Sequence, residues 1–164
     1  VIVTLDAHKD MAMPPLPRLG IMLPVERSMR HVTYYGYGPD ESYIDKREHC
    51  YVDMFQAEVE DLHENYIRPQ ENGSHYHCRY VSLENEKYRL LAEADNYLDF
   101  NVSDYTVEEL AGKRHNFELE PASGSLLSLD ARMMGIGSNS CGPQLLPQYQ
   151  MNDKEFEWEY QLKF

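Results

Sequence analysis

The sequence is poor in cysteine and tryptophan, and it has no long apolar run. Its 164 residues include three cysteines, Cys50, Cys78 and Cys141, and one tryptophan. An odd number of cysteines without a CxxC spacing indicates neither a disulfide framework nor a four-cysteine zinc site. No apolar stretch approaches the roughly 20 residues that a transmembrane helix requires. We therefore expect no membrane partner.

Basic residues are scarce relative to acidic ones. Fifteen Lys and Arg face 28 Asp and Glu, which gives a formal net charge of −13 and a pI near 4.8. Binding to nucleic acid requires clustered Lys and Arg that displace counterions from phosphates. This balance therefore argues against nucleic acid as a partner. We interpret the charge as a solvated surface, because net charge governs solubility and association rather than fold.

Several motifs of catalysis and cofactor binding are absent from the sequence. It contains no GxSxG elbow, no Walker loop and no dinucleotide-binding glycine pattern. Nucleophilic serine chemistry, phosphate binding and NAD binding therefore have no support. No cofactor is expected in this chain.

Aromatic residues, by contrast, are abundant. Thirteen Tyr and five Phe, in short runs separated by Gly, Pro, Asn and Asp, favour an all-β, antiparallel protein. The alternation is clearest over residues 156–164, where every aromatic or apolar side chain falls on one face. The expected strands are residues 1–5, 18–24, 31–37, 76–83, 88–94, 98–102, 116–120, 126–134 and 156–164.

One short helix is expected near residues 104–111. Thr106 or Asp104 is a candidate N-cap, acidic residues follow in the first turn, and Gly112 is a stop signal. With short strands elsewhere, the chain fits a single β-sandwich domain over residues 1–164. Residues 1–5 have strand character without an initiating Met, which suggests a piece of a longer polypeptide.

Residues 129–143 are the most informative segment, because a strand-like run there breaks into a loop of small and polar residues. Gly135, Gly137 and Gly142 permit close backbone approach, and we expect a positive φ at one or more of them. Short polar side chains between these glycines can reach a ligand. The candidates for substrate contact are Ser138, Asn139, Ser140 and Cys141.

Acidic residues supply further candidates, namely Glu41, Asp45, Glu71 and Asp130. No pattern marks any two as the pair of carboxyl groups about 5 to 5.5 Å apart that a retaining glycosidase needs. The first two follow a turn, and they either bond to the loop backbone and to basic residues such as Lys46, Arg47 or Arg68, or contact a ligand directly.

Histidines raise the question of a metal. Strand alternation predicts that His75 and His77 share one face and that Cys78 points to the other. A zinc site there would need His49, His63 or an acid from another strand. The alternative is that these histidines are polar positions on a half-exposed sheet. We assign no metal site.

A set of ordered motifs covers residues 36–46, 66–73, 100–110, 113–115, 129–143 and 147–150, and the closing aromatic strand completes it. Together these motifs resemble the C-terminal domain of bacterial β-galactosidases of glycoside hydrolase family 2, in particular the second half of that domain. The matching structural positions are Gly36, Gly38, Pro39, Glu41, Asp45, Pro69, Glu71, Asn72, Gly73, Arg114, His115, Asp130, Gly135 and Gly137.

The resemblance implies an antiparallel β-sandwich of the galactose-mutarotase-like, or supersandwich, type. It implies an accessory domain of a retaining β-galactosidase that hydrolyses terminal β-D-galactosides such as lactose. That domain shapes the rim of the active site and supports assembly. The catalytic glutamates of the family lie in a TIM barrel that no segment here resembles. This fragment alone is therefore expected to be inactive.

The resemblance also implies partners and a setting. The partners are the rest of the β-galactosidase chain with its TIM barrel, a galactoside substrate, and other subunits of an oligomer. Magnesium and sodium ions would bind elsewhere in the parent enzyme, whose expected location is the cytoplasm.

One loop departs from the family pattern. In many members the loop matching residues 135–143 lays a tryptophan against the sugar, whereas here it is one residue shorter and Cys141 occupies that place. The only tryptophan, Trp158, lies in the terminal strand. An alternative function is a free-standing carbohydrate-binding β-sandwich with an exposed aromatic platform. Tyr35, Tyr37 and Tyr43 would be its candidates.

Overall fold

The computed structural model describes residues 1–137 and 142–164, most of which belong to antiparallel strands. Within these ranges the strands are β1 (Ile2–His8), β2 (Arg18–Val25), β3 (His31–Gly38), β4 (Tyr51–Glu58), β5 (His75–Glu84), β6 (Arg89–Ser103), β7 (Ser125–Met133) and β8 (Glu155–Lys163). The helices are α1 (Val107–Gly112) and the 3-10 turns η1 (Val59–Leu62), η2 (Asn116–Glu118) and η3 (Pro147–Tyr149).

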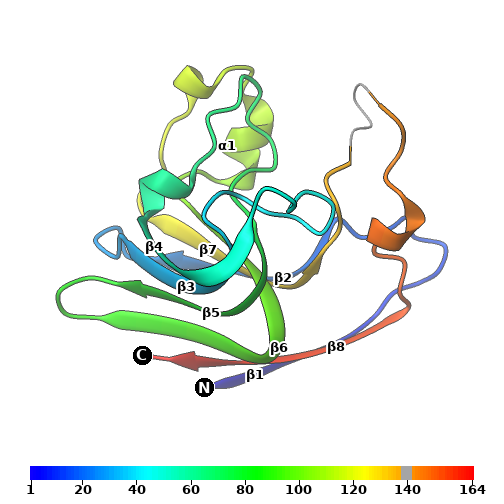
Figure 1. Ribbon diagram of the computed structural model, residues 1–164, viewed down its shortest axis with the longest axis horizontal. Helices are drawn as coiled ribbons and strands as arrows, with labels where there is room; N and C mark the ends of the chain where they lie inside the picture. The colour runs from blue at the N-terminus through cyan, green and yellow to red at the C-terminus, as the bar shows by residue number, and fades with distance from the viewer. Residues whose placement is uncertain (138–141) are drawn as a thin grey trace.

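The described strands form one antiparallel sheet that branches at its centre. Its order is β1-β8-β6-β5-β3-β4, while β7 also pairs with β6, and β2 pairs with β7. The long strand β6 creates the branch, because residues 91–93 pair with β8 and residues 99–103 pair with β7. Figure 1 shows β6 crossing the molecule, with both chain termini near its lower edge. The all-β sandwich class expected from the sequence is confirmed.

The core lies on the inner face of this curved sheet. Tyr34, Phe100 and Leu129 come from three different strands and are fully buried. In β8, Trp158 and Tyr160 are buried while the adjacent Glu157 and Glu159 are exposed. The period-two pattern expected for this strand is thus confirmed. Burial of large aromatic side chains is the main stabilising term, at roughly 25 cal/mol per Å² of apolar area.

Two strand assignments need correction. Residues 88–94 and 98–102, expected as separate strands, belong to the single strand β6. Strand β4 was not among those expected from the sequence, because it lies at the sheet edge and most of its residues are exposed. Strand β4 has no face that is buried along its whole length, so it lacks a clear hydrophobic alternation.

The expected strand at residues 116–120 is wrong. Residues Asn116–Glu118 form the 3-10 helix η2. The Glu118 carboxylate accepts hydrogen bonds from the backbone N–H groups of His115 (2.9 Å) and Arg114 (3.1 Å). These local bonds turn the chain instead of leaving its backbone groups for a neighbouring strand.

The short helix is confirmed as α1. The Thr106 hydroxyl accepts a hydrogen bond of 3.0 Å from the Glu109 backbone N–H, so Thr106 is the N-cap. Leu110 anchors the helix by burial. No helix in residues 1–137 or 142–164 has the length and apolar character needed to cross a membrane.

Candidate functional site

Three loops meet at one end of the sheet. They comprise residues 39–46 after β3, residues 63–74 before β5 and residues 134–137 after β7. Between them lies a cleft of about 460 Å³, which we call the loop cleft. Side chains from all three loops line it, including Glu41, Tyr66, Arg68, Gln70, Glu71 and Ile136. The loop cleft therefore brings together three of the motifs that the sequence singled out, at residues 36–46, 66–73 and 129–143.

Glu41 is the anchor of this end of the molecule. Its side chain is buried, and its carboxylate accepts hydrogen bonds from Lys46 Nζ (2.5 Å), the Gly73 backbone N–H (2.8 Å) and the Tyr43 hydroxyl (3.1 Å). The Tyr66 hydroxyl donates another. Burial alone would raise the pKa of Glu41, but these donors outweigh it and lower the pKa. Glu41 is a charged group with its acceptor sites in use.

Asp45 holds the start of the glycine-rich loop. Its two carboxylate oxygens accept hydrogen bonds from the backbone N–H groups of Ile136 (3.0 Å) and Gly137 (2.8 Å). Gly137 has a φ of +60°, which confirms the expected positive φ in this loop. A Cβ on Gly135 would lie 2.5 Å from the Asp45 carboxyl carbon, so this approach requires glycine.

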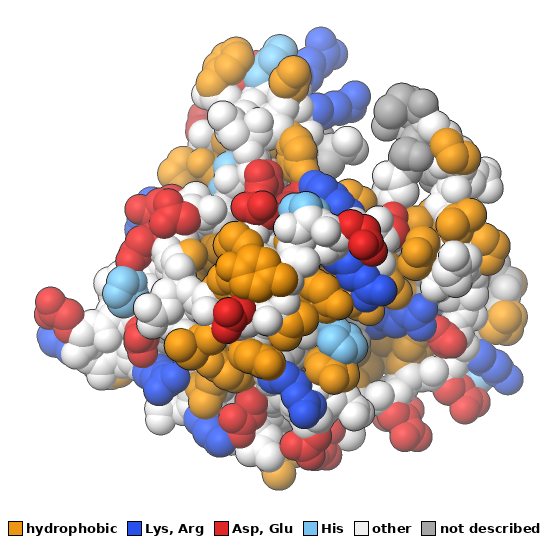
Figure 2. All heavy atoms as spheres, in the orientation of Figure 1, with side chains coloured by type: hydrophobic (Ala, Val, Ile, Leu, Met, Phe, Trp, Pro, Cys, Tyr) orange, Lys and Arg blue, Asp and Glu red, His pale blue; other side chains and the backbone are white. Residues whose placement is uncertain are grey.

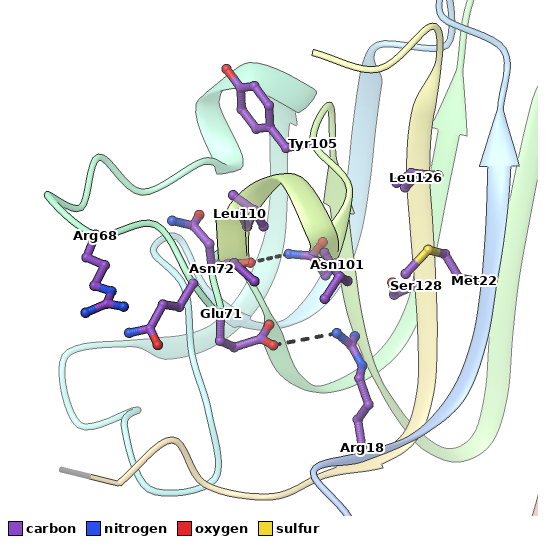
Figure 3. Close-up of a pocket in the computed structure, with 13 residues that line it drawn as sticks. Arg18, Met22, Arg68, Glu71, Asn72, Asn101, Tyr105, Leu110, Leu126 and Ser128 are labelled. Atoms are coloured by element: carbon purple, nitrogen blue, oxygen red, sulfur yellow. Dashed lines mark hydrogen bonds and ion pairs between the residues drawn. The ribbon is translucent and has the colours of Figure 1, made fainter. Parts of the chain in front are cut away.

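Arg18 links the two remaining acidic candidates. It makes a two-pronged contact with Asp130, at 2.5 Å from Nη2 and 3.2 Å from Nε. Its Nη1 lies 3.7 Å from the Glu71 carboxylate (Figure 3). Removal from bulk water raises the pKa of both carboxyl groups, and Arg18 opposes the shift in each.

Asn72 and Gly73 fix the shape of the loop that carries Glu71. The Asn72 side chain accepts from the Glu64 N–H (2.8 Å) and donates to the Glu64 carbonyl (2.7 Å). Asn101 Nδ2 donates to the Asn72 carbonyl at 2.5 Å. Gly73 has a φ of +70°, where a side chain is disfavoured. These residues therefore hold the loop against the sheet.

The glycines before the first loop serve packing. A Cβ on Gly36 would lie 2.2 Å from Cys78 Sγ. Gly38 precedes a cis peptide bond to Pro39, whose carbonyl accepts from the Tyr34 hydroxyl at 3.2 Å. Pro69 is buried beside the loop cleft. These motif positions shape the site without presenting a functional group to it.

Several candidates lie elsewhere. Arg114 and His115 are exposed beside η2 and do not line the loop cleft. Tyr43 is 2% exposed, so it is wrong as a member of an exposed aromatic platform. Tyr35 is 40% exposed and stacks on Tyr80. The candidates for substrate contact, Ser138, Asn139, Ser140 and Cys141, lie outside the described residues.

The histidine prediction is also wrong. His77 has a φ of +59° and lies in a bulge of β5, so the strict alternation of side chains fails there. His75 and Cys78 are both buried, whereas His77 is only partly so. Burial lowers the pKa of His75 to about 4, which makes it a neutral core residue. In residues 1–137 and 142–164, no three acidic, His or Cys side chains are grouped to hold a metal ion.

Sequence reasoning did not single out two residues of the loop cleft. Tyr66 and Gln70 both line it, and Tyr66 bonds to Glu41 and Lys46. Both residues lie in the motif at residues 66–73, so the motif pointed to this segment but not to the two individual residues.

Comparison with known proteins extends over the whole chain. Residues 1–163 match the family model described as "Beta galactosidase small chain". The chain is 40% identical to a protein of Actinobacillus pleuropneumoniae over 164 residues, and 40% identical to one of Staphylococcus xylosus over 162 residues. Both relatives are named β-galactosidase. The alignments cover 100% and 99% of this chain but only 16% of each relative.

Proposed function

Because this chain belongs to the β-galactosidase small chain family, we propose that it is an accessory part of a retaining β-galactosidase acting on terminal β-D-galactosides such as lactose. In this role it shapes the rim of the active site and supports assembly, while the catalytic glutamates lie in a TIM barrel elsewhere in the enzyme. The partners would be that remainder, the galactoside and further subunits. Magnesium and sodium would bind outside this chain, in a cytoplasmic enzyme.

The observation that carries the proposal is the full-length match to a small part of much longer relatives. The chain spans 16% of the two β-galactosidases to which it is 40% identical. The anchored start of the glycine-rich loop supports a role at the rim. Asp45 fixes Ile136 and Gly137 through two hydrogen bonds, so the base of the loop has a defined position.

The acids of the loop cleft support the absence of catalysis from this chain. A retaining glycosidase needs one carboxylate free to attack and a second carboxyl group able to donate a proton. Glu41 is surrounded by four donors, and Glu71 and Asp130 share the Arg18 guanidinium. Carboxylates with such partners hold neighbouring segments of the chain in place.

The exposed edge of the sheet supports a larger assembly. Strand β4 exposes Tyr51 by 58%, Val52 by 46% and Met54 by 58%. Figure 2 shows hydrophobic side chains gathered in the middle of one face among charged ones. Apolar side chains along the open edge of a sheet are normally covered by another part of the protein.

A chimeric enzyme tests the proposal. The 164 residues of this chain would replace the matching segment of the Actinobacillus pleuropneumoniae β-galactosidase, and a chromogenic galactoside would report activity. We expect the chimera to be active, and both the isolated chain and the relative lacking this segment to be inactive. A folded but inactive chimera would contradict the proposal. So would turnover by the isolated chain that survives repurification and is lost in Glu41→Gln or Glu71→Gln.

Within the chimera, Asp45→Ala tests the role of the loop. Losing the two contacts to Ile136 and Gly137 should lower kcat/KM by roughly two- to tenfold. Asp10→Ala is the matched control, because the exposed Asp10 carboxylate accepts a local hydrogen bond from the Ala12 N–H and lies outside the loop cleft. Equal kinetics for both variants would mean that the loop base has no influence on catalysis.

A further inference from the structure

A second cavity, the helix pocket, lies between α1, the loop of residues 68–72 and strands β2 and β7. Its volume is about 180 Å³. Figure 3 shows Arg18, Glu71 and Asn101 facing the same space from three different segments, with Leu110 of α1 above them. Arg68, Gln70 and Glu71 also line the loop cleft, so the two cavities adjoin at these residues.

Polar groups in the helix pocket have hydrogen-bonding capacity that the described part of the chain leaves unused. Ser128 is 4% exposed, and its hydroxyl has no hydrogen-bond partner among residues 1–137 and 142–164. Asn101 donates through Nδ2 to the Asn72 carbonyl, while its Oδ1 has no partner in the same ranges. Both atoms remain accessible, and both residues line the pocket. A ligand in the pocket can therefore form hydrogen bonds with them.

The pocket has nearly balanced charge. Arg18 is paired with Asp130 at 2.5 Å and lies 3.7 Å from Glu71. Arg68 is the second basic residue that lines the pocket, and Glu71 is the acidic residue that lines it. An anion would meet the Glu71 carboxylate, and a cation would meet two guanidinium groups. This arrangement favours a neutral ligand.

Apolar side chains form the other part of the lining. Met22 of β2 is 44% exposed and Val107 of α1 is 48% exposed, and Leu126 lies beside them in the lining. The pocket thus offers apolar surface together with an amide, a hydroxyl and a carboxylate. A sugar ring has the same division, with C–H groups on its faces and hydroxyls around its rim.

We propose that the helix pocket binds one neutral sugar ring. Its hydroxyls bond to Ser128, Asn101 and Glu71, and one of its faces packs against Met22 and Val107. A free monosaccharide and the terminal unit of an oligosaccharide share this chemistry. The inference does not depend on the proposed function, because it requires neither a barrel nor a catalytic residue.

Titration of the ¹⁵N-labelled 164-residue chain tests the proposal. Methyl β-D-galactopyranoside is the free-sugar probe, lactose is the oligosaccharide probe and inorganic phosphate is the anionic control. We expect either sugar to shift the side-chain amide signals of Asn101 and Asn72 in a saturable way. Binding of lactose alone would identify an oligosaccharide end as the ligand. Binding of phosphate alone, or of no probe, would overturn the proposal.

Two pairs of variants test whether the sugar binds in the helix pocket. Ser128→Ala should raise the Kd for the sugar by roughly two- to tenfold, whereas Ser123→Ala, at an exposed position outside the pocket, should not change it. Ala111→Phe should block the pocket from the exposed face of α1. Glu108→Phe on the same helix lies outside the lining and is its control. Unchanged binding in both pocket variants, with native spectra, would refute the assignment.

Discussion

Two buried titratable groups with opposite pKa shifts predict an unusual dependence of stability on pH. Burial raises the pKa of Asp99 to about 7 from its ordinary value of 3.8. Burial lowers the pKa of His75 to about 4 from 6.5. Each neutral form is favoured by folding, because a charge is costly to remove from water.

The two groups change the free energy of unfolding in opposite directions. Between pH 3.8 and 7 the folded chain holds a proton on Asp99 that the unfolded chain has released, so stability falls as pH rises. Between pH 4 and 6.5 the unfolded chain holds a proton on His75 that the folded chain lacks, so stability rises with pH. Each slope is about 1.4 kcal/mol per pH unit. In the wild type the two slopes have opposite signs, so they nearly cancel between pH 4 and 6.5.

Variants that remove one of the two groups should show the pH dependence of the free energy of unfolding that the other group contributes. Urea unfolding would be followed by fluorescence of the buried Trp158 from pH 5 to 8, above the pI near 4.8. In Asp99→Asn the free energy of unfolding should rise by about 2 kcal/mol between pH 5 and 6.5. In His75→Gln it should fall by about 3 kcal/mol between pH 5 and 7.

The double variant is the control for this prediction. Surface groups are common to all four proteins, so they cancel when the pH profiles are subtracted. Asp99→Asn combined with His75→Gln should restore a profile parallel to that of the wild type below pH 6.5, at a lower overall stability. If Asp99→Asn runs parallel to the wild type over the whole range, Asp99 does not titrate near neutral pH and the reasoning fails.

Two further predictions concern packing. Gly36→Ala should destabilise the fold by about 3 kcal/mol or more, because its Cβ would overlap Cys78, whereas Gly112→Ala meets nothing within 4 Å and should be neutral or slightly stabilising. Urea midpoints would compare them, and equal midpoints would contradict the packing argument. Trp158→Ala should cost about 3 to 5 kcal/mol, whereas Phe164→Ala, at an 85% exposed position, should cost little. Thermal unfolding would separate these two, and a similar Tm for both would place Trp158 outside the core.

The sequence predicts strands best where one face is buried along the whole length. Strand β8 alternates between buried aromatic residues and exposed glutamates, so its pattern is clear. Strand β4 lies at the edge and is exposed on much of both faces, so no period was available to read. The bulge at His77 has no local signal either. It is held by a hydrogen bond of 2.8 Å from the His77 N–H to Asp99, a residue 22 positions away.

The candidate site shows a similar limit. The sequence identified Glu41 and Asp45 as acids beside a turn, and it offered both backbone contacts and ligand contacts for them. The partners that decide between these roles are distant in sequence. Glu41 bonds to the N–H of Gly73, 32 residues away, and Asp45 bonds to Ile136 and Gly137, 91 and 92 residues away. Only the folded arrangement brings these groups together.

One loop thereby controls the position of the other two. Glu41 holds Gly73 and Tyr66, and Asp45, four residues later, holds Gly137. Glu41 accepts four hydrogen bonds and Asp45 accepts two, all from donors within the protein. Their chemistry serves to align the segments around the loop cleft. This aligning role agrees with the proposed accessory function, in which the acid and the nucleophile come from another part of the parent enzyme.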